Sequence, residues 1–407
     1  MLEGGITEPP GFLAAGVRAG IKKRGLDLAI IASEDGPVVA AGAFTTNRVK
    51  GAPVILTQQH VKKGKLGAIV ANSGVANVFT GKRGLRDAKE MAKVTAECLG
   101  LKPTEVGVAS TGLIGAYLPI KKVLSGIRSA AQNLSPSREA SLDAAKAIMT
   151  TDTFPKEIAV RVDLNDGTQV TIGGIAKGAG MICPKMKTAT MLAFLTTDAA
   201  ITPQALKHVL SRAVDKSFNL ITVDNDTSTS DMVLVMANGR AGNKTITETN
   251  IDENFQSGME YVTTELAWMI ASDGEGASKS IEVCVLNARN EKDARIAART
   301  VAGSNLVKAA IFGRDPNWGR IAAALGYSGA VFDPQKISIT MQSERGTAEL
   351  VKKGSPPRKK ALLKAKDVMR AKEIEIIIDL AAGKASAKAW GCDLAYDYVR
   401  VNSRYTT

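Results

Sequence analysis

Residues 158–176 read IAVRVDLNDGTQVTIGGIA, and this stretch decides the class of fold. Apolar and polar side chains alternate on both sides of Asn165-Asp166-Gly167, as they do in two half-buried strands joined by a tight turn. The stretch therefore predicts an antiparallel hairpin. A sheet that contains this hairpin is at least partly antiparallel.

The spacing of apolar residues predicts the other elements. Strands are expected at 67–74, 104–115, 231–239, 280–288, 336–344 and 373–380, and a further apolar strand opens at Thr190. Helices are expected at 83–99, 118–134, 203–218 and 252–270. Because strands and helices mix without strict alternation, we expect an α+β fold built in layers rather than a doubly wound sheet. Residues 352–360, KKGSPPRKK, predict an exposed loop.

Length and composition indicate a globular protein of one large or two ordinary domains. The chain has 407 residues, of which 45% are apolar and 23% are charged. No apolar run is long enough to span a membrane, and the amino terminus lacks the basic and apolar regions of a signal peptide. We therefore expect a cytoplasmic protein with no membrane partner.

Cysteine and histidine usage excludes several kinds of site. The four cysteines are far apart and form no C-x-x-C pair, which argues against a disulfide framework and a structural zinc site. The chain has only two histidines, His60 and His208. This number argues against a Ser-His-Asp triad and against a metal site with several histidine ligands. Nucleophilic chemistry in this chain needs a different base.

The net charge of +13 raises one alternative, a non-catalytic protein that binds nucleic acid or another polyanion. Basic clusters such as Lys22-Lys23-Arg24 and Lys62-Lys63 lack interleaved aromatic residues, and aromatic residues make up only 4% of the chain. These clusters are more typical of solvated surface. We therefore expect no nucleic-acid partner.

Residues 173–200, GGIAKGAGMICPKMKTATMLAFLTTDAA, are the most unusual stretch. Small residues surround Lys177, and a loop separates them from the apolar strand that opens at Thr190. The pattern does not match a phosphate-binding loop, because Lys177 precedes the last glycines rather than following them.

This stretch resembles the self-cleaving loop of the ornithine acetyltransferases, also called glutamate N-acetyltransferases, of arginine biosynthesis. The resemblance runs the whole length of the chain, with the motifs in the order and near the spacing of the family. The motifs are GFLAAGVRAGIKK (11–23), AGAFTTNRVKGAPV (41–54), STGLIG (110–115), IMTTDTFPK (148–156), TVDNDTSTSD (222–231), DGEGASK (273–279), FGRDPNWGRI (312–321) and YVRVNSRYTT (398–407).

The resemblance implies a layered α/β/β/α sandwich and a precursor that cuts itself between Ala189 and Thr190. Cleavage would leave an α chain of residues 1–189 and a β chain of residues 190–407, with Thr190 as its amino terminus. A free α-amino group has a pKa of about 7.7–8.0, so it can accept the hydroxyl proton of its own threonine near neutral pH. Nucleophile and base then belong to one residue, and no histidine is needed.

In this family the acetyl group passes from N-acetylornithine to the threonine and then to glutamate, which implies ping-pong kinetics. The Thr-Gly pair of STGLIG, here Thr111 and Gly112, would stabilise the oxyanion. The substrate-binding positions of the family match Thr151, Lys177, Thr190, Glu275, Asn402 and Thr407. Lys177 would be the cation for an α-carboxylate, and Glu275 a partner for the ammonium of ornithine.

The resemblance also implies the partners of the chain. The self-derived α and β chains are expected to form a heterotetramer, and neither a cofactor nor a metal is expected. Members of the family differ in whether they also accept acetyl-coenzyme A, which would be a substrate and not a bound cofactor. The sequence leaves that point open.

The cleavage loop departs from the usual pattern of the family. Residues 185–188, Lys-Met-Lys-Thr, make the loop two residues longer, with a lysine in place of an asparagine. Thr188 is therefore a competing nucleophile, and Thr190 is preferred because Met-Leu-Ala-Phe follows it in register. Val75 and Phe79 stand where the family more often has Asn and Cys, near the predicted site.

One further alternative lies within enzymes. A related self-processing amidohydrolase would use the same nucleophile, but water instead of glutamate would accept the acyl group. Exclusion of water separates the two activities, and the sequence does not show a lid that would decide between them.

Overall fold

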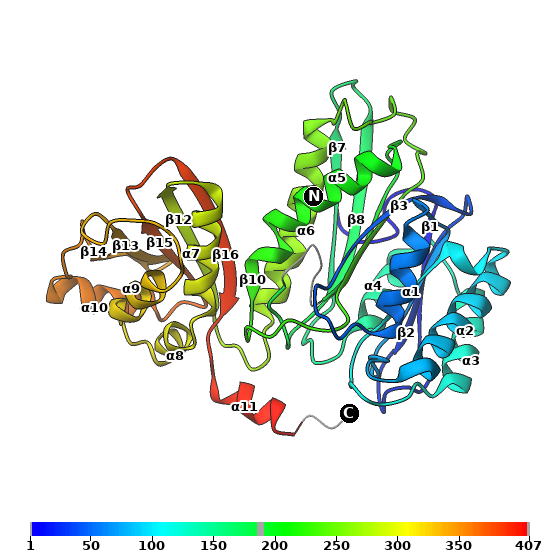
Figure 1. Cartoon of the computed structure of the whole chain (residues 1–407), viewed down its shortest axis with the longest axis horizontal. Helices are drawn as coiled ribbons and strands as arrows, with labels where there is room; N and C mark the ends of the chain where they lie inside the picture. Colours follow the sequence, from blue (N-terminus) through cyan, green and yellow to red (C-terminus); the bar gives the residue numbers. More distant parts are fainter. Residues whose placement is uncertain (1, 185–190, 405–407) are drawn as a thin grey trace. The chain divides into compact units, whose positions relative to one another are not determined.

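The computed structural model of the chain describes residues 2–184 and 191–404 (Figure 1). Contacts divide the chain into two compact units. The first contains Met1–Asn219 and Thr227–Ile270, and the second contains Leu220–Asp226 and Ala271–Tyr405. Among the described residues, no helix is both long and apolar enough to cross a bilayer.

The first unit contains two β-sheets. The four-stranded sheet has the order β1 (Phe12–Val17), β2 (Leu28–Ser33), β5 (Ala68–Asn72) and β6 (Val106–Ser110). The six-stranded sheet has the order β4 (Lys65–Leu66), β3 (Val38–Phe44), β11 (Met232–Ala237), β9 (Leu192–Thr197), β8 (Gln169–Lys177) and β7 (Lys156–Asp163). β7 and β8 pair antiparallel from Lys156↔Ala176 to Asp163↔Gln169, which confirms the predicted hairpin.

The two sheets pack face to face over a shared apolar core. Side chains of both sheets meet in it, among them Ala29, Ile31, Ile69, Phe194, Leu234 and Met236. A second core lies on the outer face of the four-stranded sheet, where Ile30, Val70 and Val108 meet Met91, Val123 and Ile127. Burial of these apolar surfaces is the main force that joins the layers.

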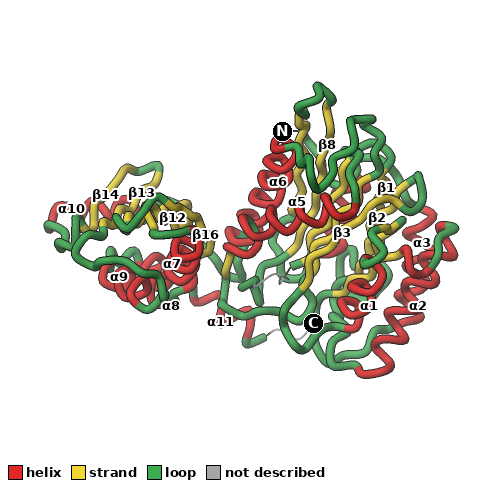
Figure 2. The backbone as a smooth tube through the Cα atoms, turned by 45° about the horizontal axis from the view of Figure 1, so that its top comes forward, coloured by secondary structure: helices red, strands yellow, loops and turns green. Residues whose placement is uncertain are grey.

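Helices cover the outer face of each sheet (Figures 1 and 2). α2 (Gly81–Leu99) and α3 (Ile120–Gln132) lie on the four-stranded sheet, and α5 (Pro203–Lys216) and α6 (Glu253–Ser272) lie on the six-stranded sheet. α1 (Ala52–Val61) and α4 (Arg138–Ile148) complete the unit, with short 3-10 turns at Pro103–Glu105 and Phe218–Leu220. The expected α+β class is thus confirmed, and the first unit is a layered α/β/β/α sandwich.

Sequence periodicity missed β1, β2 and β3. Their sequences, FLAAGV, LAIIAS and VVAAGAF, do not alternate between apolar and polar residues, and β2 is buried along its whole length. A strand covered on both faces has no solvent side to mark with polar residues. The expected strand at 104–115 is also shorter than predicted, because β6 ends at Ser110 and the glycine-containing loop that follows belongs to the site.

The second unit is built on one six-stranded mixed sheet. Its order is β10 (Ile221–Thr222), β16 (Ala385–Cys392), β12 (Ser280–Ala288), β15 (Glu373–Asp379), β13 (Ser338–Ser343) and β14 (Gly346–Val351). Its helices are α7 (Glu291–Gly303), α8 (Asn305–Gly313), α9 (Trp318–Gly326), α10 (Lys359–Val368) and α11 (Tyr396–Asn402). α7 packs against β12 and β16, and α10 packs against β13 and β14. The predicted loop at 352–360 is largely exposed, although its last two residues begin α10.

Candidate active site

Lys177 is the last residue of β8 and the centre of the candidate site. Its ammonium donates to the Thr150 hydroxyl, with 2.7 Å between Nζ and Oγ1, and to the Thr111 hydroxyl, with 3.5 Å between Nζ and Oγ1. The Lys177 side chain is only 8% exposed. The structure therefore brings together two residues predicted for the site, Lys177 and Thr111.

A buried carboxylate holds this lysine in place. Asp152 Oδ1 accepts hydrogen bonds from Lys156 Nζ at 2.8 Å and from the Gly178 N–H at 2.6 Å. Asp152 Oδ2 accepts from the Thr150 N–H at 3.0 Å and lies 3.9 Å from Lys177 Nζ. Burial raises the pKa of Asp152, but the charges of Lys177 and Lys156 and these hydrogen bonds outweigh burial and bring it to about 2. Asp152 is therefore ionised at neutral pH.

A third ammonium group lies near the same carboxylate. Lys22 donates from Nζ to the Met149 carbonyl at 2.9 Å, and its charge interacts with those of Asp152 and Lys177. Burial lowers the pKa of Lys22, and the charge of Lys177 lowers it further. The carboxylates of Asp27 and Asp152 raise it, but less than burial lowers it. Three lysines around one carboxylate favour anionic groups at this site.

The predicted oxyanion-hole pair lies in the loop after β6. The N–H of Thr111 already donates to the Asn72 carbonyl at 3.0 Å, whereas no hydrogen bond of the Gly112 N–H is found within residues 2–184 and 191–404. Gly112 has a φ of +125°, and a Cβ there would lie 2.3 Å from the carbonyl carbon of Gly74, so only glycine fits. Lys177 donates to Thr111 Oγ1, which leaves the hydroxyl hydrogen to point elsewhere. The two donors suited to an oxyanion are therefore the Thr111 hydroxyl and the Gly112 N–H.

A second buried carboxyl group lies just before β11. Asp231 is 1% exposed, and in the part of the chain that the structure describes its Oδ2 has no hydrogen-bond partner. Burial raises the pKa of Asp231 well above its ordinary value, and Ser228 and Lys177 oppose this only in part. Burial therefore shifts the protonation equilibrium of Asp231 towards its neutral form.

The predicted cleavage bond lies outside the described residues. This holds for Ala189, for Thr190 and for its competitor Thr188, and Thr407 at the carboxyl terminus is outside them as well.

The flanks of the cleavage segment are described, and residues 227–232 hold both. On the amino side, Thr227 Oγ1 donates to the Cys183 carbonyl at 2.9 Å. On the carboxyl side, the Met232 N–H donates to the Met191 carbonyl at 2.9 Å. One short segment therefore anchors the chain before and after the predicted bond.

The structure changes the interpretation of two other predictions. Thr151 is half-buried, but the hydroxyl that contacts Lys177 is that of Thr150, one position earlier. Val75 forms a parallel β-bridge with Leu113 and so lies beside the loop that contains Thr111 and Gly112, whereas Phe79 is 77% exposed. Of the two unusual residues, only Val75 is placed to shape this loop.

In the second unit, two predicted substrate-binding residues meet. Asn402 Nδ2 donates to Glu275 Oε2 at 2.7 Å. Burial raises the pKa of the neighbouring Tyr398, and the carboxylates of Asp224, Glu275 and Asp226 raise it further. This local negative charge suits an ammonium group. Across the described residues, no group of three His, Cys, Asp or Glu side chains is arranged to hold a metal ion.

The first unit thus belongs to the class of layered α/β/β/α proteins, and Lys177, Thr111 and Gly112 lie close together where its strands end. The chain belongs to the ArgJ family, whose model matches residues 13–407. This confirms the family predicted from the motifs.

Relatives of known name agree with this assignment. The arginine biosynthesis bifunctional protein ArgJ of Symbiobacterium thermophilum is 53% identical over 410 residues, covering 100% of this chain and 99% of its own. The glutamate N-acetyltransferase of Methanothermobacter thermautotrophicus is 50% identical over 409 residues, covering 100% and 98%. Among solved structures, the ornithine acetyltransferase of Mycobacterium tuberculosis complexed with ornithine is 42% identical, covers 47% of this chain and 97% of its own, and has a TM-score of 0.42.

The variant Asp152→Asn tests the buried anchor. The neutral amide that it introduces cannot balance the charges of Lys156 and Lys177, and removal of one member of a buried ion pair costs about 3–5 kcal/mol. We expect the free energy of unfolding at pH 7, measured by urea denaturation, to fall by about this amount.

The same variant has a predicted pH dependence. The pKa of Asp152 is lowered from 3.8 to about 2 in the folded chain, so its stabilising effect is full above pH 4 and disappears as the pH falls towards 2. The difference between wild type and Asp152→Asn should therefore shrink over this range. A difference that stays constant from pH 7 to pH 2 would contradict the assignment.

Asp231→Asn should show the opposite pH dependence. Because the pKa of Asp231 is raised on folding, the folded chain binds this proton more tightly, and the wild type loses stability as the pH rises above the ordinary value of 3.8. The introduced amide does not titrate, so the variant should gain stability relative to the wild type with rising pH. Thermal or urea unfolding between pH 4 and pH 8 measures this, with the surface variant Asp143→Asn as the control. A variant that loses relative stability with rising pH would show that the ionised form of Asp231 is preferred.

Proposed function

We propose that this chain transfers the acetyl group of N-acetylornithine to glutamate in arginine biosynthesis, through an acetyl-threonine at Thr190. The observation that carries the proposal is the contact of Lys177 with the Thr111 hydroxyl, beside Gly112 and at the end of β8. The stretch between β8 and β9 contains the bond that the family motif marks for cleavage. The names of the relatives, glutamate N-acetyltransferase and arginine biosynthesis bifunctional protein, support the same activity.

Cleavage before Thr190 would give an α chain of 1–189 and a β chain of 190–407. β8 would belong to the first, and β9 and β11 to the second. β8 pairs with β9 from Ile172↔Thr197 to Lys177↔Leu192, so the hydrogen bonds of the sheet would still join the two chains after the cut. The proposed maturation therefore releases an amine without taking the sandwich apart.

In the proposed first half-reaction, the Thr190 hydroxyl attacks the acetyl carbonyl while the amine of the same residue takes the hydroxyl proton. The oxyanion accepts hydrogen bonds from the Thr111 hydroxyl and the Gly112 N–H. The intermediate then collapses, the C–N bond breaks, and the proton held by the amine goes to departing ornithine. In the second half-reaction the amine of glutamate attacks the ester carbonyl, and the C–O bond to Thr190 breaks. The proton lost by the glutamate amine passes through the Thr190 amine to the threonine oxygen, which restores the hydroxyl and releases N-acetylglutamate.

The two substrates share an α-carboxylate and differ in the end of the side chain. In this proposal Lys177 pairs with the shared carboxylate, with Asp152 fixing its position. Glu275 is proposed as a substrate-binding residue from its match to the family motif. Asn402 and Thr407 take part in substrate binding, and Thr151 does so through its backbone or its half-buried side chain. The α and β chains assemble into a heterotetramer. Formation of N-acetylglutamate from acetyl-coenzyme A and glutamate is the assay for a second acetyl donor.

Substitution of Thr190 tests the nucleophile. Thr190→Ala removes the hydroxyl, so we expect neither a cut chain nor detectable transfer, whereas Thr188→Ala should behave as wild type. Transfer is measured as glutamate-dependent release of ornithine from N-acetylornithine, with mass spectrometry of the product. Cleaved and active Thr190→Ala would overturn the nucleophile, and an inactive Thr188→Ala would move it by two residues. Equal release of ornithine with and without glutamate would indicate the amidohydrolase instead.

Gly112→Ala tests the oxyanion loop. A Cβ at Gly112 meets the backbone of Gly74 at 2.3 Å, while one at Gly115 in the same loop, which also has positive φ, meets nothing within 4 Å. Loss of one oxyanion donor costs about 10²–10³ in kcat. We therefore expect kcat to fall by about this factor in Gly112→Ala and to change little in Gly115→Ala. Equal kcat values for the two variants would show that the Gly112 N–H does not serve the reaction.

A further inference from the structure

Strand β3 is paired on only part of one edge. Along its other edge it pairs with β11 from Val39↔Ala237 to Phe44↔Met232. On the free side, β4 reaches only Val38 and Val39, and one more bond runs from the Ala40 N–H to the Gly64 carbonyl at 2.9 Å. Beyond Ala40 no strand continues on this side within the described chain.

The direction of the backbone groups follows from the bonds at the two ends of β3. The Ala40 N–H points to the free edge, and the Thr45 N–H donates to the Asp231 carbonyl on the β11 side at 3.1 Å. Because successive residues of a strand alternate, the N–H and C=O of Gly42 and the N–H of Phe44 face the free edge. Among residues 2–184 and 191–404, no hydrogen bond to these groups is found. Unpaired groups of this kind are a template for another strand.

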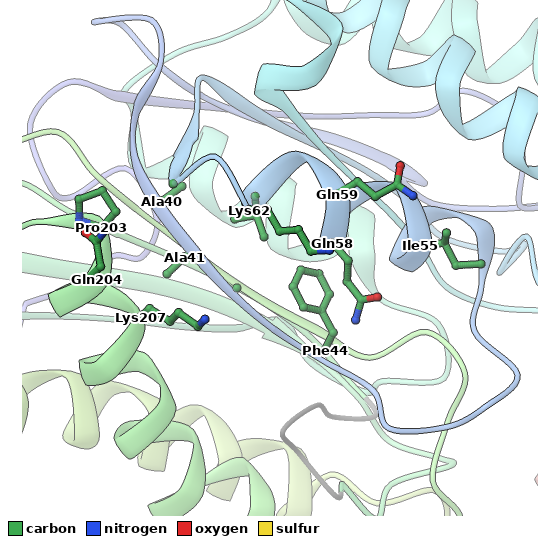
Figure 3. A pocket seen from close by; sticks show the side chains of 13 residues that line it. Ala40, Ala41, Phe44, Ile55, Gln58, Gln59, Lys62, Pro203, Gln204 and Lys207 are labelled. Atoms are coloured by element: carbon green, nitrogen blue, oxygen red, sulfur yellow. The ribbon is translucent and has the colours of Figure 1, made fainter.

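A cavity of about 630 Å³ lies along this free edge. Its floor is Ala40, Ala41, Gly42 and Phe44, its first wall is one stripe of α1 with Ile55, Gln58, Gln59 and Lys62, and its second wall is the start of α5 with Pro203, Gln204 and Lys207. Figure 3 shows the floor of small residues between the two helices. Of the floor residues, Gly42 is half-buried and Ala40, Ala41 and Phe44 are buried, so Gly42 is the point at which a ligand in the cavity would reach the backbone of β3.

The charge of the groove selects the ligand. Lys62 and Lys207 stand on opposite walls, and none of the described residues that line the cavity is acidic. Figure 3 shows the side chains of Lys62 and Lys207 on the same side as Phe44. The amino-terminal end of α5, at Pro203 and Gln204, adds a partial positive charge to the second wall. The three glutamines supply uncharged hydrogen-bonding groups. A second copy of the same edge would bring the lysines of two grooves together, which disfavours pairing of the chain with itself.

We propose that the groove between α1 and α5 binds an extended acidic peptide segment of another protein, which adds to β3 as a strand. Main-chain hydrogen bonds to Gly42 and Phe44 supply the affinity, and carboxylates that reach Lys62 and Lys207 supply the specificity. The groove is lined by residues that the acetyl-transfer site does not use, so it is an interaction surface separate from that site.

Binding of a defined peptide tests the proposal. The probe is acetyl-Glu-Val-Glu-Val-Glu-amide, titrated into the full chain by isothermal calorimetry, with the matched peptide acetyl-Lys-Val-Lys-Val-Lys-amide as control. We expect saturable binding of the acidic peptide with a Kd below about 1 mM, and none of the basic peptide. Absence of saturable binding, or equal binding of both peptides, overturns the proposal.

A charge-reversal variant tests the role of charge, and N-methylated peptides test the addition of a strand. Lys207→Glu should raise the Kd of the acidic peptide at least tenfold. Lys121→Glu, an equal charge change on an exposed residue of α3, should leave this Kd unchanged. In an added strand, alternate amides face β3, so of two peptides N-methylated at alternate residues one should lose binding and the other keep it. Equal effects of the two methylation patterns, or a groove found covered by a second copy of the chain in gel filtration and cross-linking, would contradict strand addition.

Discussion

The buried carboxylate of Asp152 is the constraint on which the candidate site depends. It links the segment after α4 to the paired strand ends of the hairpin, at the start of β7 and just after β8. The charges are tolerated in the interior only because Lys156 and Lys177 lie beside the carboxylate and backbone N–H groups complete its hydrogen bonds. Without Asp152, the buried charge of Lys177 would be unbalanced on this side, and its hydrogen bond to Thr111 would no longer be stabilised.

The sheets explain where the site forms. In the four-stranded sheet, β5 and β6 run parallel, so the loops that follow them leave the same edge and Gly112 packs on Gly74. In the six-stranded sheet, β9 and β11 are parallel to one another and antiparallel to β8, which brings the end of β8 to the same level as the starts of β9 and β11. Lys177, Met191 and Asp231 therefore lie at one end of the sheet. The segment 227–232 holds both flanks of the predicted cleavage loop at this end.

Periodicity predicted the elements that face water on one side. The amphipathic α2 and α3 and the strands β12 and β15 have exposed or half-buried residues along one side, and each was predicted close to its bounds. The hairpin of β7 and β8 was predicted with the help of its Asn-Asp-Gly turn, since β8 is buried from Val170 to Lys177. β1, β2 and β3 lie between other layers and have no such stripe, so their small apolar residues carry no period. α7, α8 and α9 were missed as well, and their sequences are rich in alanine and glycine.

The candidate site was predictable where a motif marked it, and not where geometry alone creates it. Lys177, Thr111 and Gly112 come from motifs, and the structure places Lys177 against Thr111. Asp152 and Asp231 also lie inside quoted motifs, but only folding shows their surroundings. Asp152 lies among lysines that lower its pKa, and Asp231 is buried with no hydrogen-bond partner for Oδ2 among the described residues. Thr150 rather than Thr151 contacts Lys177 because the turn after α4 directs its hydroxyl to the strand end.

The most direct test of the account is the intact mass of the purified wild-type chain, together with amino-terminal sequencing of any fragment. The account predicts two fragments that co-purify, the larger of which begins at Thr190. A new terminus at Thr188 would place the nucleophile two residues earlier. A single uncut chain under conditions that support acetyl transfer would contradict the central claim, since the catalytic amine would then not exist.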